Sequence, residues 1–349
     1  MFSKLTIPTL ATALCFGLIA CQGTPEATTG STETADLPGS GITVIPSNSD
    51  FIEEQFFTEI VNIGLEKLGY EVKDIKLADY AALNLTVANG DLTYTTGFYT
   101  PPHTEFFDKA GGEEKLESFS SLIVGSGIQG ILADKKTAEQ YGFKNLEQLK
   151  DPELAKLFDS DGDGKANLAG CQAGWNCNVQ INHHIEVYGL KDTVEQDQGA
   201  YSALLADVIT RYEQGKPILY YAYVPHWVSQ VLKPDEDVVW LEVPFTSLAG
   251  DLAKMTEKDT TVDGKNLGYS FVTQKILANQ EFVDANPAAK RWFELVQIPT
   301  ADVNAESLRI YEGENSNEDI RRHAEEWVKK NQELFDGWLE EAKNAATSS

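Results

Sequence analysis

The sequence predicts an α/β fold divided between two lobes, and three observations support this prediction. The chain has 349 residues, of which 42% are hydrophobic and 10% aromatic; this is enough for a sizeable core and long for a single one. Strand and helix patterns alternate along the first third of the chain. A glycine-rich apolar stretch at residues 121–132 then suits a chain that crosses from one lobe to the other.

The first lobe is predicted from an alternation of short elements. Residues 41–45 form an apolar run typical of a buried strand, and a helix capped at Asp50 follows up to Gly69 with apolar residues at helical spacing. The next expected elements are a strand at 70–72, a helix at 80–88 and a strand at 92–99. This order favours a parallel sheet.

The second lobe and the return of the chain follow. Helices are expected at 146–158 and 201–214, strands at 217–223 and 238–243, and a return crossing at 268–273. Lobe 1 therefore comprises 37–130 and 269–345, and lobe 2 comprises 131–268.

The C-terminal part is predicted to be helical from Asn286 onward. Its last helix, 317–342, places one set of residues roughly on one face: Ile320, His323, Trp327, Leu334 and Trp338. Apolar residues at helical period usually pack in a core, so we expect these side chains to be structural.

The N-terminus has the pattern of an exported lipoprotein. Residues 1–20 carry one charge, Lys4, followed by an apolar stretch too short to span a bilayer. Residues 18–21 resemble a lipobox, which predicts lipidation of Cys21; an ordinary signal peptide with an incidental cysteine is the alternative. Residues 21–36 have almost nothing to bury and should form a flexible tether. We expect the mature protein outside the cytoplasm, anchored to the membrane by lipid.

The strongly negative net charge argues against nucleic acid as a partner. At −26, the chain would be repelled by nucleic acid and by anionic lipid headgroups. A covalent lipid therefore suits membrane attachment better than a basic patch does.

Cysteine usage predicts a disulfide. Cys15 leaves with the signal sequence and Cys21 is lipidated, so Cys171 and Cys177 remain to pair outside the cytoplasm. A metal site is the alternative, but no matched histidine pair provides zinc spacing.

Motifs of catalysis and of metal binding are weak. The sequence has no nucleophile elbow, phosphate-binding glycine loop or HExxH helix, which lowers the prior for an enzyme. We expect no cofactor and no catalytic residues. Asp159, Asp161 and Asp163 have the spacing of a calcium loop, but Gly170 occupies the position of its bidentate glutamate, so a solvated turn is the better interpretation.

Three aromatic segments stand beside predicted strand ends and turns: 97–103, 171–177 and 220–227. Together with 35–44, 148–159 and 334–338, they resemble the ProX family, the glycine betaine-binding proteins of ProU-type ABC importers. The resemblance runs in order from about residue 35 to about residue 345. It implies a type II periplasmic-binding-protein fold, with two Rossmann-like lobes joined by a two-segment hinge and a ligand between them.

The resemblance implies an aromatic box for a quaternary ammonium group. The matching positions are Tyr99, Trp175 and Tyr223. A trimethylammonium group has no N–H to donate, so ring faces must attract it, at about 0.5 to 2 kcal/mol per ring. The family has tryptophan at all three positions, so the two tyrosines should attract the cation less strongly.

The carboxylate end of a betaine needs donors, which the resemblance assigns to His103 and to the backbone N–H groups of Asn176 and Cys177. The disulfide would fix Trp175 and these donors before ligand binds. A carboxylate near His103 should favour a protonated imidazole, so binding is expected to weaken as pH rises through the histidine range. His183 and His226 have no comparable match and are taken as structural.

The predicted function is capture of glycine betaine, with proline betaine as a further ligand, for an ABC permease and its ATPase. We expect a monomer that closes by a hinge motion. Two alternatives stay open: a binding protein for choline or carnitine, and an anchored enzyme acting on a small amine.

Overall fold

The computed structural model describes residues 37–125 and 127–347. The predicted signal sequence, the tether and Cys21 lie outside the described residues.

The first sheet has five strands and is mixed. In spatial order these are β4 (Lys76–Leu77), β2 (Pro46–Asn48), β5 (Tyr94–Thr100), β15 (Thr273–Asn279) and β6 (Leu116–Ser121). β2 runs parallel to β4 and β5, whereas β15 runs antiparallel to both β5 and β6. The strands on which the prediction of a parallel sheet rested do pair in parallel, but the sheet as a whole is mixed, because β15 enters from a distant part of the chain and in the opposite direction.

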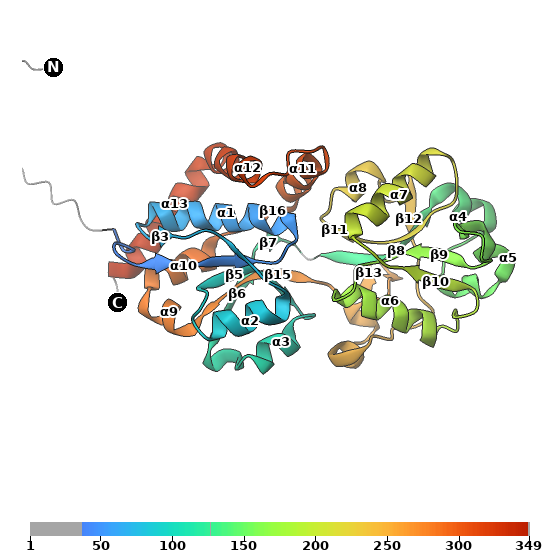
Figure 1. Ribbon diagram of the computed structural model, residues 1–349, viewed down its shortest axis with the longest axis horizontal. Coiled ribbons are helices and arrows are strands. Elements are labelled where there is room, and N and C mark those ends of the chain that lie inside the picture. Colours follow the sequence, from blue (N-terminus) through green and yellow to red (C-terminus); the bar gives the residue numbers. More distant parts are fainter. Residues whose placement is uncertain (1–36, 126, 348–349) are drawn as a thin grey trace, which may run out of the picture. The chain divides into compact units, whose positions relative to one another are not determined.

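Helices cover both faces of this sheet (Figure 1). On one face a large apolar core is formed by α1 (Ile52–Lys67), α10 (Pro287–Leu295), α11 (Thr300–Tyr311), α12 (Asn317–Lys330) and α13 (Gln332–Thr347). On the other face a smaller core lies beneath α2 (Tyr80–Ala88) and α3 (Thr104–Lys109). Two short two-stranded sheets and one further helix complete this half. β1 (Thr43–Val44) pairs with β3 (Glu71–Val72), β7 (Ile123–Val124) pairs with β16 (Ile298–Pro299), and the helix is α9 (Gln280–Ala285).

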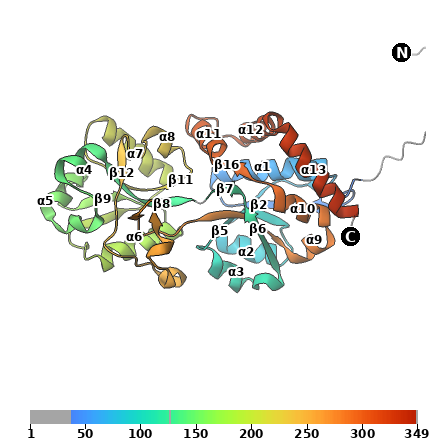
Figure 2. The ribbon, with the colours of Figure 1, turned by 180° about the vertical axis from the view of Figure 1, so that it is seen from behind.

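The second sheet also has five strands. In spatial order these are β10 (Val194–Asp197), β9 (Ala166–Ala169), β11 (Leu219–Val224), β8 (Ile128–Asp134) and β12 (Val238–Trp240). β10, β9 and β11 are parallel, and β8 is antiparallel to β11 and β12. Figures 1 and 2 show α6 (Asn176–Val187) on one side of this sheet and α7 (Tyr201–Glu213) on the other. The remaining elements are α4 (Lys135–Tyr141), α5 (Pro152–Ala155), α8 (Val228–Val231), β13 (Thr261–Val262) and β14 (Lys265–Asn266).

Two segments join the sheets side by side. One leads from β7 to β8 and the other leads into β15, and Gly127 and Val272 exchange two backbone hydrogen bonds, of 2.7 and 3.2 Å. A Cβ on Gly127 would lie 3.1 Å from the Val272 carbonyl oxygen, so glycine permits this close approach.

Several predicted elements differ from the structure. The strand expected at 41–45 is replaced by β1 and β2, which belong to different sheets, and the strand expected at 238–243 ends at Trp240. The helix expected at 317–342 is two helices, α12 and α13, that break at Asn331, and the break changes the helical phase so that Leu334 is 47% exposed. Residues 146–158 form 3₁₀ turns around the four-residue α5. α1 begins after Phe51, not after a capping Asp50.

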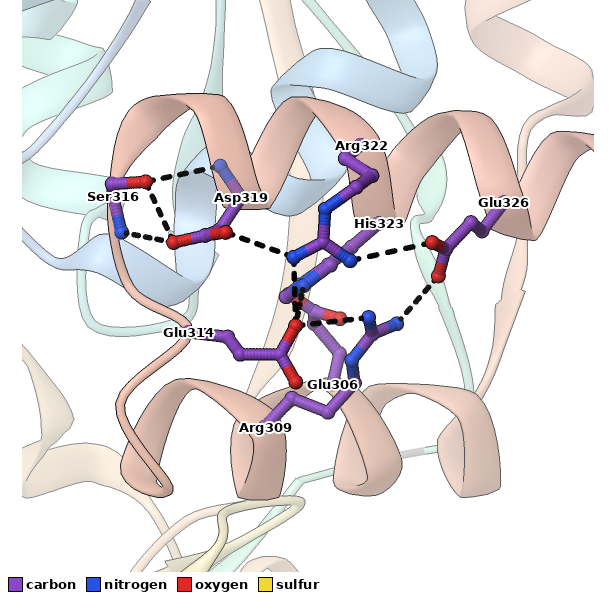
Figure 3. A network of polar contacts seen from close by, with 8 residues as sticks. All are labelled: Glu306, Arg309, Glu314, Ser316, Asp319, Arg322, His323 and Glu326. Carbon is purple, nitrogen blue, oxygen red and sulfur yellow. Dashed lines mark hydrogen bonds and ion pairs between the residues drawn. The ribbon is translucent and has the colours of Figure 1, made fainter.

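A buried histidine joins α11 to α12. His323 Nδ1 lies 2.8 Å from a Glu306 carboxylate oxygen and Nε2 lies 3.0 Å from Glu314. Arg309 and Arg322 both pair with Glu314 at the rim of this network (Figure 3). The structural role expected for His323 agrees with its full burial in these contacts.

Candidate functional site

A cavity of about 410 Å³ lies between the two sheets, and every residue predicted to contact the ligand lines it. Its volume falls within the range of small-molecule sites, about 300–1,000 Å³. The predicted site residues that line it are Tyr99, His103, Trp175, Asn176, Cys177 and Tyr223. Segments more than 120 residues apart in sequence thus meet at one cavity.

Tyr99 lines the cavity from the end of β5. Its hydroxyl donates to Glu54 Oε1 at 2.9 Å, and its ring meets that of Tyr80 edge to face, with centroids 5.8 Å apart. Tyr80 is the first residue of α2 and donates to the same Glu54 oxygen at 3.0 Å. The carboxylate therefore fixes two phenol rings on the side of the first sheet.

Trp175 and Tyr223 line the cavity from the second sheet, with two further rings between them. Tyr201, on α7, lies 5.6 Å from Trp175 and 5.7 Å from Tyr223, measured between ring centroids. Phe51, at the start of α1, lies 5.6 Å from Trp175 and 6.3 Å from Tyr223. Phe51 therefore brings a ring from the first half of the molecule against the rings of the second.

Asn176 and Cys177 begin α6, so their backbone N–H groups have no partner within the helix. The positive end of the helix dipole lies at the same place. Cys171 and Cys177 form a disulfide, as predicted. It closes the loop that carries Trp175 directly before these donors.

His103 is buried and neutral. The backbone N–H of Tyr99 donates to His103 Nδ1 at 3.2 Å, which leaves the ring proton on Nε2. Burial lowers the pKa of His103 to about 3. The protein by itself therefore does not favour the protonated imidazole expected from the sequence, because a ring 7% exposed loses the hydration that a charge requires.

The electrostatics of the cavity favour a cation. Among the lining residues that the structure describes there is no lysine or arginine, whereas Glu53, Glu105 and Asp251 contribute carboxylates. Glu105 and Asp251 are exposed. Glu53 is 14% exposed; its Oε1 lies 3.6 Å from His226 Nε2, and its Oε2 is buried without a hydrogen-bond partner.

Four lining residues were missed by the sequence reasoning: Phe51, Glu53, Tyr80 and His226. Tyr201, which packs behind the lining against Trp175 and Tyr223, was missed as well. His226, taken as structural from sequence, lines the cavity 4.7 Å from the Tyr223 ring, whereas His183 donates to or accepts from Ser247 away from it. One available signal was position, because Phe51 and Glu53 follow a strand and open a helix, where ligands of α/β sheets bind.

Two groups of side chains have the spacing to hold a metal ion in the described chain. Asp159, Asp161 and Asp163 accept backbone N–H groups of their own loop, as in the solvated turn expected there. In the other group, hydrogen bonds from Arg322 and His323 lower the pKa of Glu314 to about 2, so arginine already neutralises it.

No helix in the described part of the chain is both long and apolar enough to cross a membrane.

The sequence matches known proteins over most of its length. Residues 42–330 match OpuAC, the substrate binding domain of ABC-type glycine betaine transport systems. The chain is 47% identical over 319 residues to the glycine betaine-binding periplasmic protein OusX of Dickeya dadantii, covering 91% of this chain and 95% of that one. It is 46% identical over 322 residues to the glycine betaine/proline betaine-binding periplasmic protein of Escherichia coli, covering 91% and 96%.

Solved structures share the fold at low identity. A lactococcal OpuAC closed on glycine betaine superposes with a TM-score of 0.62 at 18% identity, covering 85% of this chain and 99% of that one. A choline binding protein in complex with choline gives 0.64 at 17% identity, covering 88% and 97%. These structures confirm the predicted bilobal α/β fold. The family model and the relatives, which are substrate-binding proteins, agree with the prediction of a binding protein in place of an enzyme. The chain belongs to the family of substrate-binding domains of ABC-type glycine betaine transport systems.

Proposed function

We propose that this protein captures glycine betaine or proline betaine in the cavity and delivers it to an ABC permease. The observation that carries the proposal is chemical: one cavity combines aromatic rings and unpaired helix N–H groups, with no lysine or arginine among its described lining residues. The relatives' ligands agree with it.

The ammonium end is assigned to Tyr99, Trp175 and Tyr223. Ring faces attract a methylated cation without needing a hydrogen bond, and the absence of lysine and arginine from the described lining removes competing charges. Phe51 and Tyr201 contact Trp175 and Tyr223 and hold the rings in place.

The carboxylate end is assigned to the backbone N–H groups of Asn176 and Cys177 and to the Nε2–H of His103. A carboxylate at a helix N-terminus is stabilised by unpaired N–H groups and by the helix dipole. A neutral His103 still has one N–H to donate, and its burial costs less than the burial of a charged ring.

The two halves of the molecule are proposed to close around the ligand. We infer that residues 37–130 with 269–345, and residues 131–268, act as the two lobes and close about the segments at Gly127 and Val272. The closed form would then be recognised by the permease, with the protein acting as a monomer.

We also propose a lipid anchor at Cys21, based on the lipobox-like residues 18–21. Metabolic labelling with palmitate should mark the wild-type chain and leave Cys21→Ser unlabelled. Labelling of both chains, or of neither, would contradict the anchor.

The ligand assignment is tested at the first residue of α6. Asn176→Pro removes one backbone donor at a helix position that tolerates proline, and Trp175 before it has an extended backbone that proline permits. Asn176→Ala is the matched control, since both variants lose the same contact from Gln180. Glycine betaine affinity should fall about tenfold in the proline variant relative to the alanine variant.

Choline is the second candidate, favoured by the lack of lysine and arginine in the described cavity lining. A choline site predicts equal affinities in the two variants, because choline has no carboxylate. Calorimetry with glycine betaine and choline on both variants therefore separates the two functions.

A further inference from the structure

Glu54 is the buried carboxylate of this site that lacks a countercharge. Its side chain is fully buried in α1, at 0% exposure. The described residues form no ion pair with it, and only neutral groups donate to it: the Ser49 backbone N–H at 2.8 Å and the hydroxyls of Tyr80 and Tyr99. Burying an ionised carboxylate is costly unless a cation or several donors compensate for the lost water.

The surroundings keep this carboxylate against β5. A Cβ on Gly97 would lie 2.7 Å from Glu54 Oε2, so glycine at this position leaves the room that the carboxylate occupies. Burial raises the pKa of Glu54, while the hydrogen bonds from Ser49, Tyr99 and Tyr80 oppose that rise. A cation brought near would lower this pKa and so favour the ionised form.

We propose that Glu54 is a positioning residue for the ammonium site: it fixes the rings of Tyr99 and Tyr80 and balances the charge of the bound cation through Tyr99. The proposal rests on the proposed function, since it requires a cationic ligand beside Tyr99. A hydroxyl that donates to a carboxylate gains electron density, which makes its ring face more attractive to a cation. Tyrosine, unlike phenylalanine, provides this link.

The adjacent Glu53 differs in its contacts. Its Oε1 lies 3.6 Å from His226 Nε2, and the hydroxyl of Tyr99 donates to Glu54 instead. The two neighbouring glutamates at the start of α1 therefore contact different rings. Glu54 accepts from Tyr80 and Tyr99 on the side of the first sheet, whereas Glu53 lies beside His226.

The test compares ligands that differ in charge alone. Glycine betaine and 3,3-dimethylbutanoate have the same shape and carboxylate, but the second has carbon in place of the ammonium nitrogen. In Glu54→Gln, affinity for glycine betaine should fall about tenfold while affinity for 3,3-dimethylbutanoate stays equal or rises. Glu59→Gln is the matched control, since it removes a carboxylate of the same helix that pairs with Arg321.

A merely structural role gives a different result, because a collapsed site would weaken both ligands equally. Equal loss for both ligands, or unchanged glycine betaine binding in a folded Glu54→Gln protein, would overturn the proposal. Failure of the wild-type chain to bind glycine betaine or tetramethylammonium would instead overturn the proposed function.

Tyr99→Phe provides a second route that does not depend on the folding of Glu54→Gln. Loss of the hydroxyl should weaken binding of tetramethylammonium about fivefold. If both single variants fold, the affinity of the double variant for tetramethylammonium should lie within about twofold of that of Glu54→Gln, because both changes remove the hydrogen bond between Tyr99 and Glu54. Unchanged binding in Tyr99→Phe, or fully additive losses, would contradict the role of Glu54.

Discussion

Trp175 is the one tryptophan among the three proposed box residues, and it contacts rings from both halves of the molecule. Phe51 approaches it from α1 and Tyr201 from α7, each with centroids 5.6 Å away. Because the indole face attracts a cation more strongly than phenol or phenyl does, Trp175 should contribute most to the proposed binding energy.

Replacing Trp175 by phenylalanine tests this ranking. Trp175→Phe should weaken glycine betaine binding about tenfold, because the smaller ring offers a weaker quadrupole. Calorimetry measures the affinity, and Trp338→Phe, in the core of the first half, serves as the control. A Trp175→Phe protein that binds as tightly as the wild type would exclude the aromatic box.

His103 shows how a tertiary environment changes the chemistry of a residue that the sequence identifies. The sequence suggests a cationic partner for a carboxylate, but burial lowers the pKa to about 3 and the Tyr99 N–H occupies Nδ1. The remaining function is donation from Nε2–H by a neutral ring.

The low pKa of His103 predicts that its contribution to ligand binding does not change with pH near neutrality. Because the ring is neutral above about pH 4, its contribution to binding should be the same from about pH 5 to 8. The ratio of glycine betaine affinities between wild type and His103→Leu should therefore stay constant over that range. A ratio that grows toward acidic pH would show a protonated imidazole.

At the scale of the element, α6 combines a disulfide with a helix start. Cys177 is the second residue of the helix and Cys171 precedes the loop, both with little exposure. The bridge therefore restricts the segment that contains Trp175 and the unpaired N–H groups, which lowers the ordering cost of ligand binding.

Removing the bridge should reduce both stability and affinity. In the chain-entropy model a loop of this size contributes about 2 kcal/mol to the free energy of unfolding. Chemical denaturation of residues 37–349 should show this loss in Cys171→Ala/Cys177→Ala, with weaker glycine betaine binding. Dithiothreitol should reproduce the loss in the wild type and have no effect on the variant; a dithiothreitol-sensitive variant would contradict this origin.

At the scale of the whole molecule, α11 connects the two cores. Val303 and Ile310 pack in the core of the first sheet, while the Tyr311 ring stacks on Trp227 with centroids 3.9 Å apart and planes 12° apart. Trp227 belongs to the core of the second sheet, and its backbone N–H donates to Ser307 Oγ at 2.9 Å. The proposed hinge opening would separate these partners.

Tyr311 should therefore influence affinity without lining the cavity. Tyr311→Ala removes a stacked pair that stabilises the closed arrangement, so glycine betaine should bind about fivefold more weakly. Its preference among ligands should not change. Tyr141→Ala, at an exposed tyrosine on α4, is the control for calorimetry; a changed ligand ranking in Tyr311→Ala would indicate direct contact instead.

The sequence by itself determined those features that depend on local pattern and on short motifs. Helical spacing predicted α2 with its observed bounds, and α7 to within one residue. The family resemblance carried by the aromatic segments and their flanks predicted six site residues, and all six line the cavity. The cysteine count predicted the disulfide.

Only the tertiary structure decided the features that depend on distant partners. β15 reaches the first sheet from more than 150 residues beyond β6, which makes that sheet mixed. Burial makes His103 neutral, and Phe51, Tyr80, Tyr201 and Glu54 join the site through side-chain contacts that no periodicity records. Period and motif are properties of neighbours in sequence, whereas charge state and ring geometry depend on what folding brings together.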